Sequence, residues 1–195
     1  VRAYDDAIYP SSVAGFSKYI SSDGKAPGYD PLKILVSLAH SHKLKIHAWM
    51  NPYRVSSTKI LDPASETTTA RIVNQVKEII NRYAVDGIHF DDYFYPTVDE
   101  GIDVDLYTNY RNEGGELSLG DWRRENVNTF ISGLYSSVKS IKQDVKVVIS
   151  PAGDIEKNYS MLYADVLKWC SQGGYADIIM PQLYYGFKNS SKPFL

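Results

Sequence analysis

The chain has 195 residues, enough for one domain with a buried core but short for a complete (β/α)8 barrel of about 250 residues. Its net charge of −2 gives no electrostatic basis for binding nucleic acid or an anionic membrane. No apolar run approaches the roughly 18 residues of a membrane span, so we expect none in this sequence.

Short apolar runs alternate with helical patterns along the chain. The first residues resemble the end of a strand, and Gly and Pro residues predict a long loop over 10–28. Asp30 and Pro31 predict a helix start, with Asp30 as the N-cap. Cys170 lies in a helical run and is expected to be a buried structural thiol. Helices are also predicted for 69–83, 121–142 and 160–172, strands for 44–50, 85–90, 145–149 and 176–183, and a polar loop for 96–120.

This alternation of continuous apolar strands with helices is typical of a parallel sheet covered by helices. We therefore expect an α/β fold of the (β/α)8 TIM-barrel type, with residues 1–195 forming a single catalytic-type domain. An open doubly wound sheet is the alternative, although no Gly-rich phosphate loop follows any predicted strand. No cofactor is predicted.

Polar and aromatic residues gather where three of the predicted strands end. In parallel α/β folds these C-terminal ends carry the chemistry. A barrel would bring these side chains into one cavity, which would suit a sugar. Because side chains alternate along a strand, three groups are each expected to share a face: His47, Trp49 and Asn51; His89, Asp91 and Tyr93; Gln182 and Tyr184.

Asp91 and Asp92 follow the apolar run 85–90 directly. A charged group in this position is costly unless it is solvated or paired. A glycosidase needs carboxylates there, one to attack or orient and one to donate a proton. The structural alternative is that both cap the loop or bind an arginine such as Arg54. Asp154 and Glu156, just past a later strand, are candidate proton donors by position alone.

Two other functions fit the same residues. His47 and His89 could bind a divalent metal together with Asp91 or Asp92, as in a metal-dependent polysaccharide deacetylase. A barrel that binds carbohydrate without catalysis is also consistent, because no proton donor is identified. We favour hydrogen-bonding roles for both histidines and predict no metal site.

Two segments have an unusual composition: His47-Ala-Trp-Met-Asn-Pro-Tyr-Arg54 and Asp86-Gly-Ile-His-Phe-Asp-Asp-Tyr-Phe-Tyr-Pro96. With residues 1–2, 6–11, 28–32, 83–85, 122–128, 149–151 and 181–184, they resemble the bacterial glycosyl-hydrolase-like family 10, which is distinct from xylanase family 10. The resemblance implies a TIM-barrel glycoside hydrolase that is exported to the cell envelope or beyond, often as a lipoprotein. It also implies cleavage of a bacterial polysaccharide, in particular peptidoglycan glycan strands without peptide stems.

The resemblance and the strand pattern together select the site. Asp91 and Asp92 are the expected catalytic residues. The substrate-binding residues expected are Arg2, Asp6, His47, Trp49, Asn51, Tyr53, Arg54, His89, Tyr93, Tyr95, Gln182 and Tyr184.

A weaker likeness connects Asp86, Gly87 and Asp91 with the Asp-Gly-x-Asp-x-Asp-x-Glu motif of chitinase-type enzymes. His89 replaces the middle aspartate of that motif, and Tyr93 replaces its proton-donating glutamate. We therefore do not expect substrate-assisted, chitinase-type chemistry at this site.

The position of the matching segments also suggests how much of a barrel the chain contains. Residues 1–2 resemble the end of the second barrel strand, and 181–184 the end of the sixth. We expect about four long parallel strands, corresponding to strands 3 to 6 of eight, in a fragment of a longer protein with little or no activity by itself.

Overall fold

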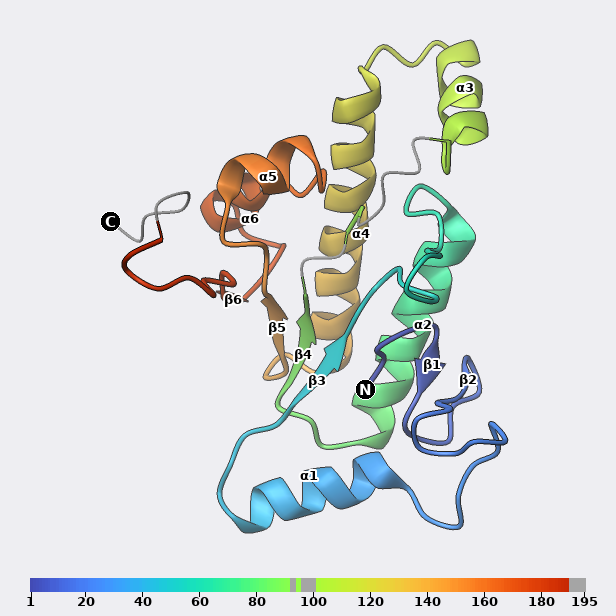
Figure 1. The fold of residues 1–195 in the computed structure, drawn as a ribbon, viewed down its shortest axis with the longest axis vertical. Coiled ribbons are helices and arrows are strands. Elements are labelled where there is room, and N and C mark those ends of the chain that lie inside the picture. The colour runs from blue at the N-terminus through green and yellow to red at the C-terminus, as the bar shows by residue number, and fades with distance from the viewer. Residues whose placement is uncertain (92–93, 96–100, 190–195) are drawn as a thin grey trace.

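The fold is built on one parallel sheet. The computed structural model describes residues 1–91, 94–95 and 101–189. Trp49 pairs with His89, and His89 with Val148, so the three longer strands are aligned at one level. The strands lie side by side in sequence order (Figure 1): β3 (His47–Met50), β4 (Gly87–Phe90), β5 (Lys146–Ile149) and β6 (Ile178–Ile179).

This strand order is that of a barrel. Each strand lies beside the next one in the sequence, whereas a doubly wound sheet reverses its order at a switch point. Helices connect each pair of strands: α2 (Glu66–Arg82), then α3 (Val104–Asn112) and α4 (Leu119–Ile141), then α5 (Ile155–Ser160) and α6 (Val166–Ser171). The predicted α/β class, its (β/α)8-type order and the four parallel strands are confirmed. The strands are shorter than predicted, with four residues in β3, β4 and β5 and two in β6.

The chain enters the fold beside β3. Arg2 forms a parallel bridge with Met50, and its carbonyl accepts a hydrogen bond from the Asn51 backbone at 2.8 Å. The first residues thus extend the sheet at its β3 edge, as the sequence suggested. The next segment was predicted as a loop but contains β1 (Asp6–Ala7), which pairs in parallel with β2 (Gly15–Phe16).

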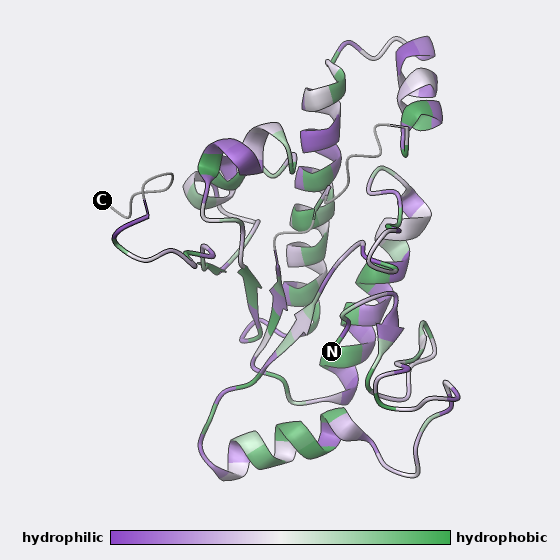
Figure 2. Cartoon of the chain, in the orientation of Figure 1, coloured by the Kyte–Doolittle hydropathy of each residue, from purple (hydrophilic) through white to green (hydrophobic). Residues whose placement is uncertain are grey.

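The two faces of the sheet have different environments. Met50, Ile88 and Phe90 are fully buried in the hydrophobic core on the face that α2 and α4 cover. Figure 2 shows apolar stretches on both helices alongside the strands. The residues that alternate with these along the strands, among them Trp49 and His89, lie on the other face and are more exposed to solvent. The helix-covered face therefore stabilises the sheet, and the open face carries the polar side chains.

Helix α4 forms where the sequence predicts it. The Ser118 side chain caps it by accepting the Asp121 N–H at 3.2 Å. Val127, Ile131 and Leu134 then recur at helical spacing and are buried. α2 presents a similar buried stripe, and the two helices pack against each other.

Helix α1 (Pro31–Ser41) lies across the N-terminal ends of the strands (Figure 1). Asp30 caps it by accepting the Lys33 N–H at 3.1 Å, as predicted. Leu32 and Val36 are buried, whereas Leu35 is 47% exposed. α1 is therefore only partly covered in the described part of the chain.

The region predicted as one helix over 160–172 instead contains the last residue of α5, a break and then α6. Asp154 and Asp165 cap them, each accepting the backbone N–H three residues later. Tyr163, between the helices, has a φ of 49°, which a continuous helix does not allow. Cys170 is exposed in α6, so the predicted buried thiol is wrong. The predicted loop 96–120 contains α3, which has no buried residue among those described. None of the described helices combines the length and apolar character that a bilayer crossing requires.

Candidate active site

The C-terminal ends of β3, β4, β5 and β6 lie at one edge of the sheet (Figure 1), and the sequence analysis expected the chemistry at three of them, those of β3, β4 and β6. β3 is followed by Asn51, β4 by Asp91 and β5 by Ser150. The candidate site therefore consists of this edge and the open face that leads to it.

His47, Trp49 and His89 share the open face, as predicted. A methyl group at Gly87 would lie 2.8 Å from the Cδ2 atom of His47, so the His47 ring rests directly on the backbone of β4. Trp49 is the strand neighbour of His89, and its side chain is 39% exposed. His47 lies at the start of β3, where it lines a cavity with Lys45 and Lys146, and Trp49 and His89 lie further toward the C-terminal ends of the strands.

His89 is half-buried on the open face. Burial lowers its pKa, and the nearby His47 lowers it further. Its ordinary pKa is 6.5, so the His89 ring is neutral at neutral pH and can both donate and accept a hydrogen bond. A neutral, two-way hydrogen-bonding group suits the hydroxyls of a sugar.

Asp91 follows the last residue of β4 and is only 6% exposed. β4 ends at Phe90, so Asp91 is the first residue past the strand and the alternation that puts His89 on the open face does not by itself place its side chain. The end of β4 therefore carries a buried carboxylate, and the strand itself presents the neutral His89 ring on the open face. Asp92 and Tyr93, also predicted for the site, lie outside the described residues.

The ends of β5 and β6 are fastened together by Gln182. Its backbone bridges to Ala152, and its Nε2 atom donates to the Ser150 carbonyl at 2.9 Å. The predicted binding role of Gln182 is therefore combined with a structural one. Tyr184 follows at 85% exposure and is free to contact a ligand.

Arg2 and Tyr53 were predicted to bind substrate, but both are completely buried. The Arg2 guanidinium donates to the carbonyls of Asn51 and Pro52 and to the Gln75 side chain. The Tyr53 ring packs 5.5 Å from the ring of Phe130. Both side chains stabilise the scaffold, and neither lines a cleft.

Asn51 and Tyr95 require the same correction. β3 ends at Met50, so the alternation used to place Asn51 does not extend to it; Asn51 is fully buried and its Oδ1 accepts the Arg54 N–H at 3.1 Å. Tyr95 is 2% exposed and its hydroxyl donates to Asp103 at 3.1 Å. Arg54 lies in the loop after β3, where its backbone bridges to Ile60.

Asp6 lies beside this edge and lines a cavity of about 390 Å³ with aromatic residues that the sequence analysis did not select. Tyr4 and Tyr19 contribute their rings, and Lys18 adds a cation. All lie in or near a segment predicted as a loop. In the sequence, Tyr4 is followed by two aspartates and Tyr19 is preceded by Lys18. Tyrosines directly beside charged residues are the signal that could have identified this cavity.

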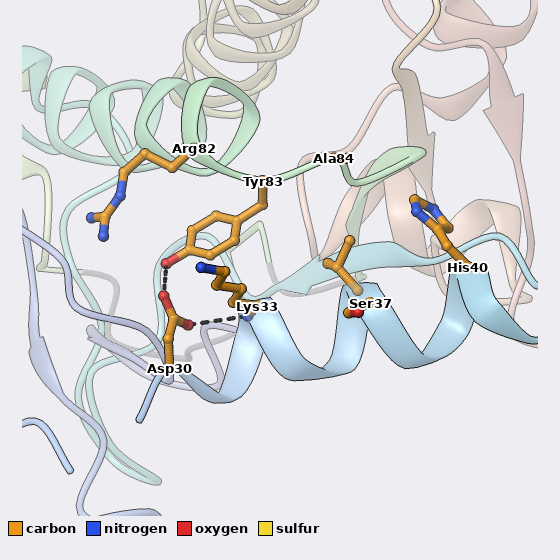
Figure 3. Close-up of a pocket in the computed structure, with 8 residues that line it drawn as sticks. Asp30, Lys33, Ser37, His40, Arg82, Tyr83 and Ala84 are labelled. Carbon is orange, nitrogen blue, oxygen red and sulfur yellow. Dashed lines mark hydrogen bonds between the residues drawn. The ribbon is translucent and has the colours of Figure 1, made fainter. Parts of the chain in front are cut away.

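A second cavity, of about 650 Å³, lies at the opposite end, between α1 and the end of α2 (Figure 3). There the Tyr83 hydroxyl donates to Asp30 at 2.6 Å, and His40 lies 3.0 Å from Asp86. These contacts tie α1 to the neighbouring elements, as expected for the stabilising end of a barrel. This cavity is separate from the candidate site.

The other proposed proton donors lie in α5 and its cap. The Asp154 carboxylate accepts the Lys157 N–H at 2.9 Å, and Glu156 is exposed in the first turn. Asp154 therefore has a capping role. As for metals, no three His, Cys, Asp or Glu side chains converge within the described residues, which do not include Asp92.

Comparisons with known proteins agree with this geometry. The sequence model of the family described as glycosyl hydrolase-like 10 matches residues 54–194. The chain is 34% identical to glycosyl hydrolase DigH of Escherichia coli (strain K12), over 98% of this chain and 54% of that protein. It is 32% identical to glycosyl hydrolase YngK of Bacillus subtilis (strain 168), over 95% of this chain and 45% of that protein. The chain thus spans about half the length of the curated relatives it matches.

Among solved structures, the galactosidase domain of alpha-galactosidase-sucrose kinase, AgaSK, is similar with a TM-score of 0.45 and 13% identity. The match covers 78% of this chain and 21% of that chain. The assignment of the fold therefore rests on the strand order alone.

Proposed function

Because this chain belongs to the glycosyl hydrolase-like 10 family, we propose that it supplies the catalytic strand end of a glycoside hydrolase, with Asp91 as nucleophile or general base. The observation that carries the proposal is the buried Asp91 carboxylate at the C-terminal end of β4, in the strand that presents the neutral His89. Catalytic residues of barrel enzymes come from such strand ends.

Glycoside hydrolysis uses two carboxylates. Asp92, the next residue in the chain, is the proposed partner of Asp91 and lies outside the described residues. The distance between the two carboxyl groups would decide the stereochemistry: about 5 Å retains the anomeric configuration, and about 6.5–9.5 Å inverts it.

The proposed substrate is a bacterial polysaccharide, and peptidoglycan glycan strands without peptide stems are the leading candidate. The family resemblance supports this choice, and so do the rings on the open face. Trp49 and Tyr184 offer exposed aromatic surface, on which the apolar face of a sugar can pack. We further propose an exported protein that acts in the cell envelope or outside the cell, without a cofactor.

The test incubates the protein with peptide-free peptidoglycan glycans and determines the masses of the products. We expect shorter glycans from the wild type and almost none from Asp91→Asn, which has nearly the same shape. The matched control is Asp144→Asn, because Asp144 is an exposed aspartate before β5. Full activity of the Asp91→Asn variant would refute the assignment.

The same experiment separates the two alternatives. Glycan binding without shorter products from the wild type would indicate a carbohydrate-binding barrel. Products that have lost acetyl groups at unchanged chain length, with activity removed by a chelator, would indicate a metal-dependent deacetylase.

A further inference from the structure

The cavity beside Asp6 lies between the first residues of the chain and the loop that follows β3. Its volume is about 390 Å³. The side chains that matter most for its chemistry are those of Tyr4, Asp6, Lys18, Tyr19 and Ser56. None of Tyr4, Lys18, Tyr19 and Ser56 belongs to the site proposed above.

The buried Arg2 fixes the two walls of this cavity to each other. Its guanidinium donates to the Pro52 carbonyl at 2.8 Å and to the Gln75 side chain at 2.9 Å. It also donates to Asp5 at 2.9 Å, and Asp5 accepts from Arg71 at 2.8 Å. The first wall is therefore anchored to both the loop after β3 and α2, so the cavity is held by buried contacts.

Aromatic rings form one side of the cavity. The rings of Tyr4 and Tyr19 are stacked, with centroids 6.1 Å apart and planes inclined by 25°. Tyr19 is 67% exposed, and the Lys18 ammonium lies 5.5 Å from its centroid. An exposed ring beside a donor of hydrogen bonds is suited to the apolar face and the hydroxyls of a pyranose.

The charges in the cavity favour a ligand with many hydroxyls over an anion. Asp5 is paired with Arg2 and Arg71, whereas the Asp6 carboxylate accepts the Tyr4 N–H at 3.2 Å and interacts at longer range with Arg2 and the Val1 amino group. A phosphate or carboxylate ligand would approach Asp6 at an electrostatic cost. A sugar hydroxyl can donate to Asp6 and accept from Lys18 at the same time.

We propose that this cavity is an additional glycan subsite, which holds one pyranose residue against Tyr19 with its hydroxyls on Asp6 and Lys18. The inference rests on the proposed function and extends it. Residues 55–57 of the loop after β3 line the cavity, which places it on the side of the C-terminal end of β3. A long glycan would fill both places, and a short one only the site at Asp91.

The test measures glycan binding by calorimetry in the Asp91→Asn protein, which prevents turnover. We compare Tyr19→Ala with Tyr29→Ala, because Tyr29 is a similarly exposed tyrosine just before α1, at the opposite end of the strands. Tyr19→Ala should weaken the binding of long glycans about fivefold and leave the shortest bound ones unchanged. Tyr29→Ala should change neither, and thermal unfolding should show both variants folded.

Equal affinities of the Tyr19→Ala and Tyr29→Ala variants for long glycans would overturn the subsite, as would an equal loss for short and long glycans. A failure of the proposed function looks different. In that case the wild type would bind glycans without cleaving them, and the comparison of binding would still decide the subsite.

Discussion

Arg123 and Asp103 form a buried ion pair with two hydrogen bonds, Nε to Oδ2 at 2.8 Å and NH2 to Oδ1 at 2.6 Å. Their exposures are 4% and 1%, and the hydrogen bond with Asp103 raises the pKa of Arg123. The pair joins α4 to the start of α3. The Tyr95 hydroxyl donates to the same Asp103 oxygen that accepts from Nε, so the network also holds the Tyr95 side chain.

Breaking this pair should strongly destabilise the fold. Arg123→Met leaves the Asp103 carboxylate buried without its cation, and we expect a loss of about 3–5 kcal/mol in the free energy of unfolding. The control is Arg111→Met, because Arg111 is exposed at the end of α3 and its loss should cost less than about 0.5 kcal/mol. Urea unfolding measures both. Similar midpoints for the two variants would show that the pair contributes little.

The contact between Gly87 and His47 should make position 87 intolerant of any side chain. Gly87→Ala would force the His47 ring away from β4, and we expect a loss of about 1–3 kcal/mol. Gly133, in the exposed part of α4, has open space around it. Gly133→Ala should therefore stabilise the protein by about 0.5–1 kcal/mol. Thermal unfolding compares the two, and a shift in the same direction for both would contradict this account.

Trp49 and Trp169 should separate glycan binding from stability. Trp49 is 39% exposed on the open face, so Trp49→Ala should weaken glycan binding by about 1 kcal/mol with a modest effect on unfolding. Trp169 is 2% exposed, and its Nε1 donates to Asn128 at 2.7 Å. Trp169→Ala should cost about 3–5 kcal/mol of stability. Calorimetry and urea unfolding test this, and unchanged binding in Trp49→Ala would remove that ring from the site.

Asp5 should make the fold sensitive to acid. Burial raises its pKa, but the hydrogen bonds and charges of Arg71 and Arg2 outweigh that effect and hold the pKa below its usual 3.8. A depressed carboxyl pKa stabilises the folded state above the unfolded pKa, and this stability is lost as the pH falls through the folded pKa. Unfolding free energy should thus decrease below about pH 4.

The control for this acid effect is Asp5→Asn, which removes the titrating group. Its stability should already be lower at neutral pH, and it should change less between about pH 4 and pH 2. Identical slopes of stability against pH in the two proteins would show that Asp5 does not contribute.

Much of the fold could be predicted from local chemistry. The Asp30 cap, the helical stripe of α4 and the apolar strands specify their elements directly, because caps and periodicity act within a few residues. The interruption between α5 and α6 was not predicted; each helix has its own aspartate cap, and Tyr163 between them takes a positive φ of 49°. α3 was missed because the described part of it buries nothing, which leaves no apolar period to detect.

The site was only partly predictable for a related reason. The alternation of side chains along a strand correctly placed His47 and Trp49 on one face. β3 ends at Met50, however, so this rule does not extend to Asn51. Polar residues such as Arg2 and Tyr95 point equally well to ligand binding and to buried networks. Only their partners in space distinguish the two, and those partners lie up to 73 residues away in the sequence.

The most direct test of the central claim is hydrolysis of peptide-free glycans in water enriched in heavy oxygen, with Asp91→Asn alongside. A glycoside hydrolase transfers a water oxygen to the anomeric carbon at each new reducing end, so each wild-type cut should give one fragment with one heavy oxygen and one fragment without, and the variant should form almost no fragments. Cleavage in which neither fragment carries the heavy isotope, or equal amounts of labelled product from Asp91→Asn, would contradict the assignment of Asp91 as the catalytic carboxylate of a glycoside hydrolase.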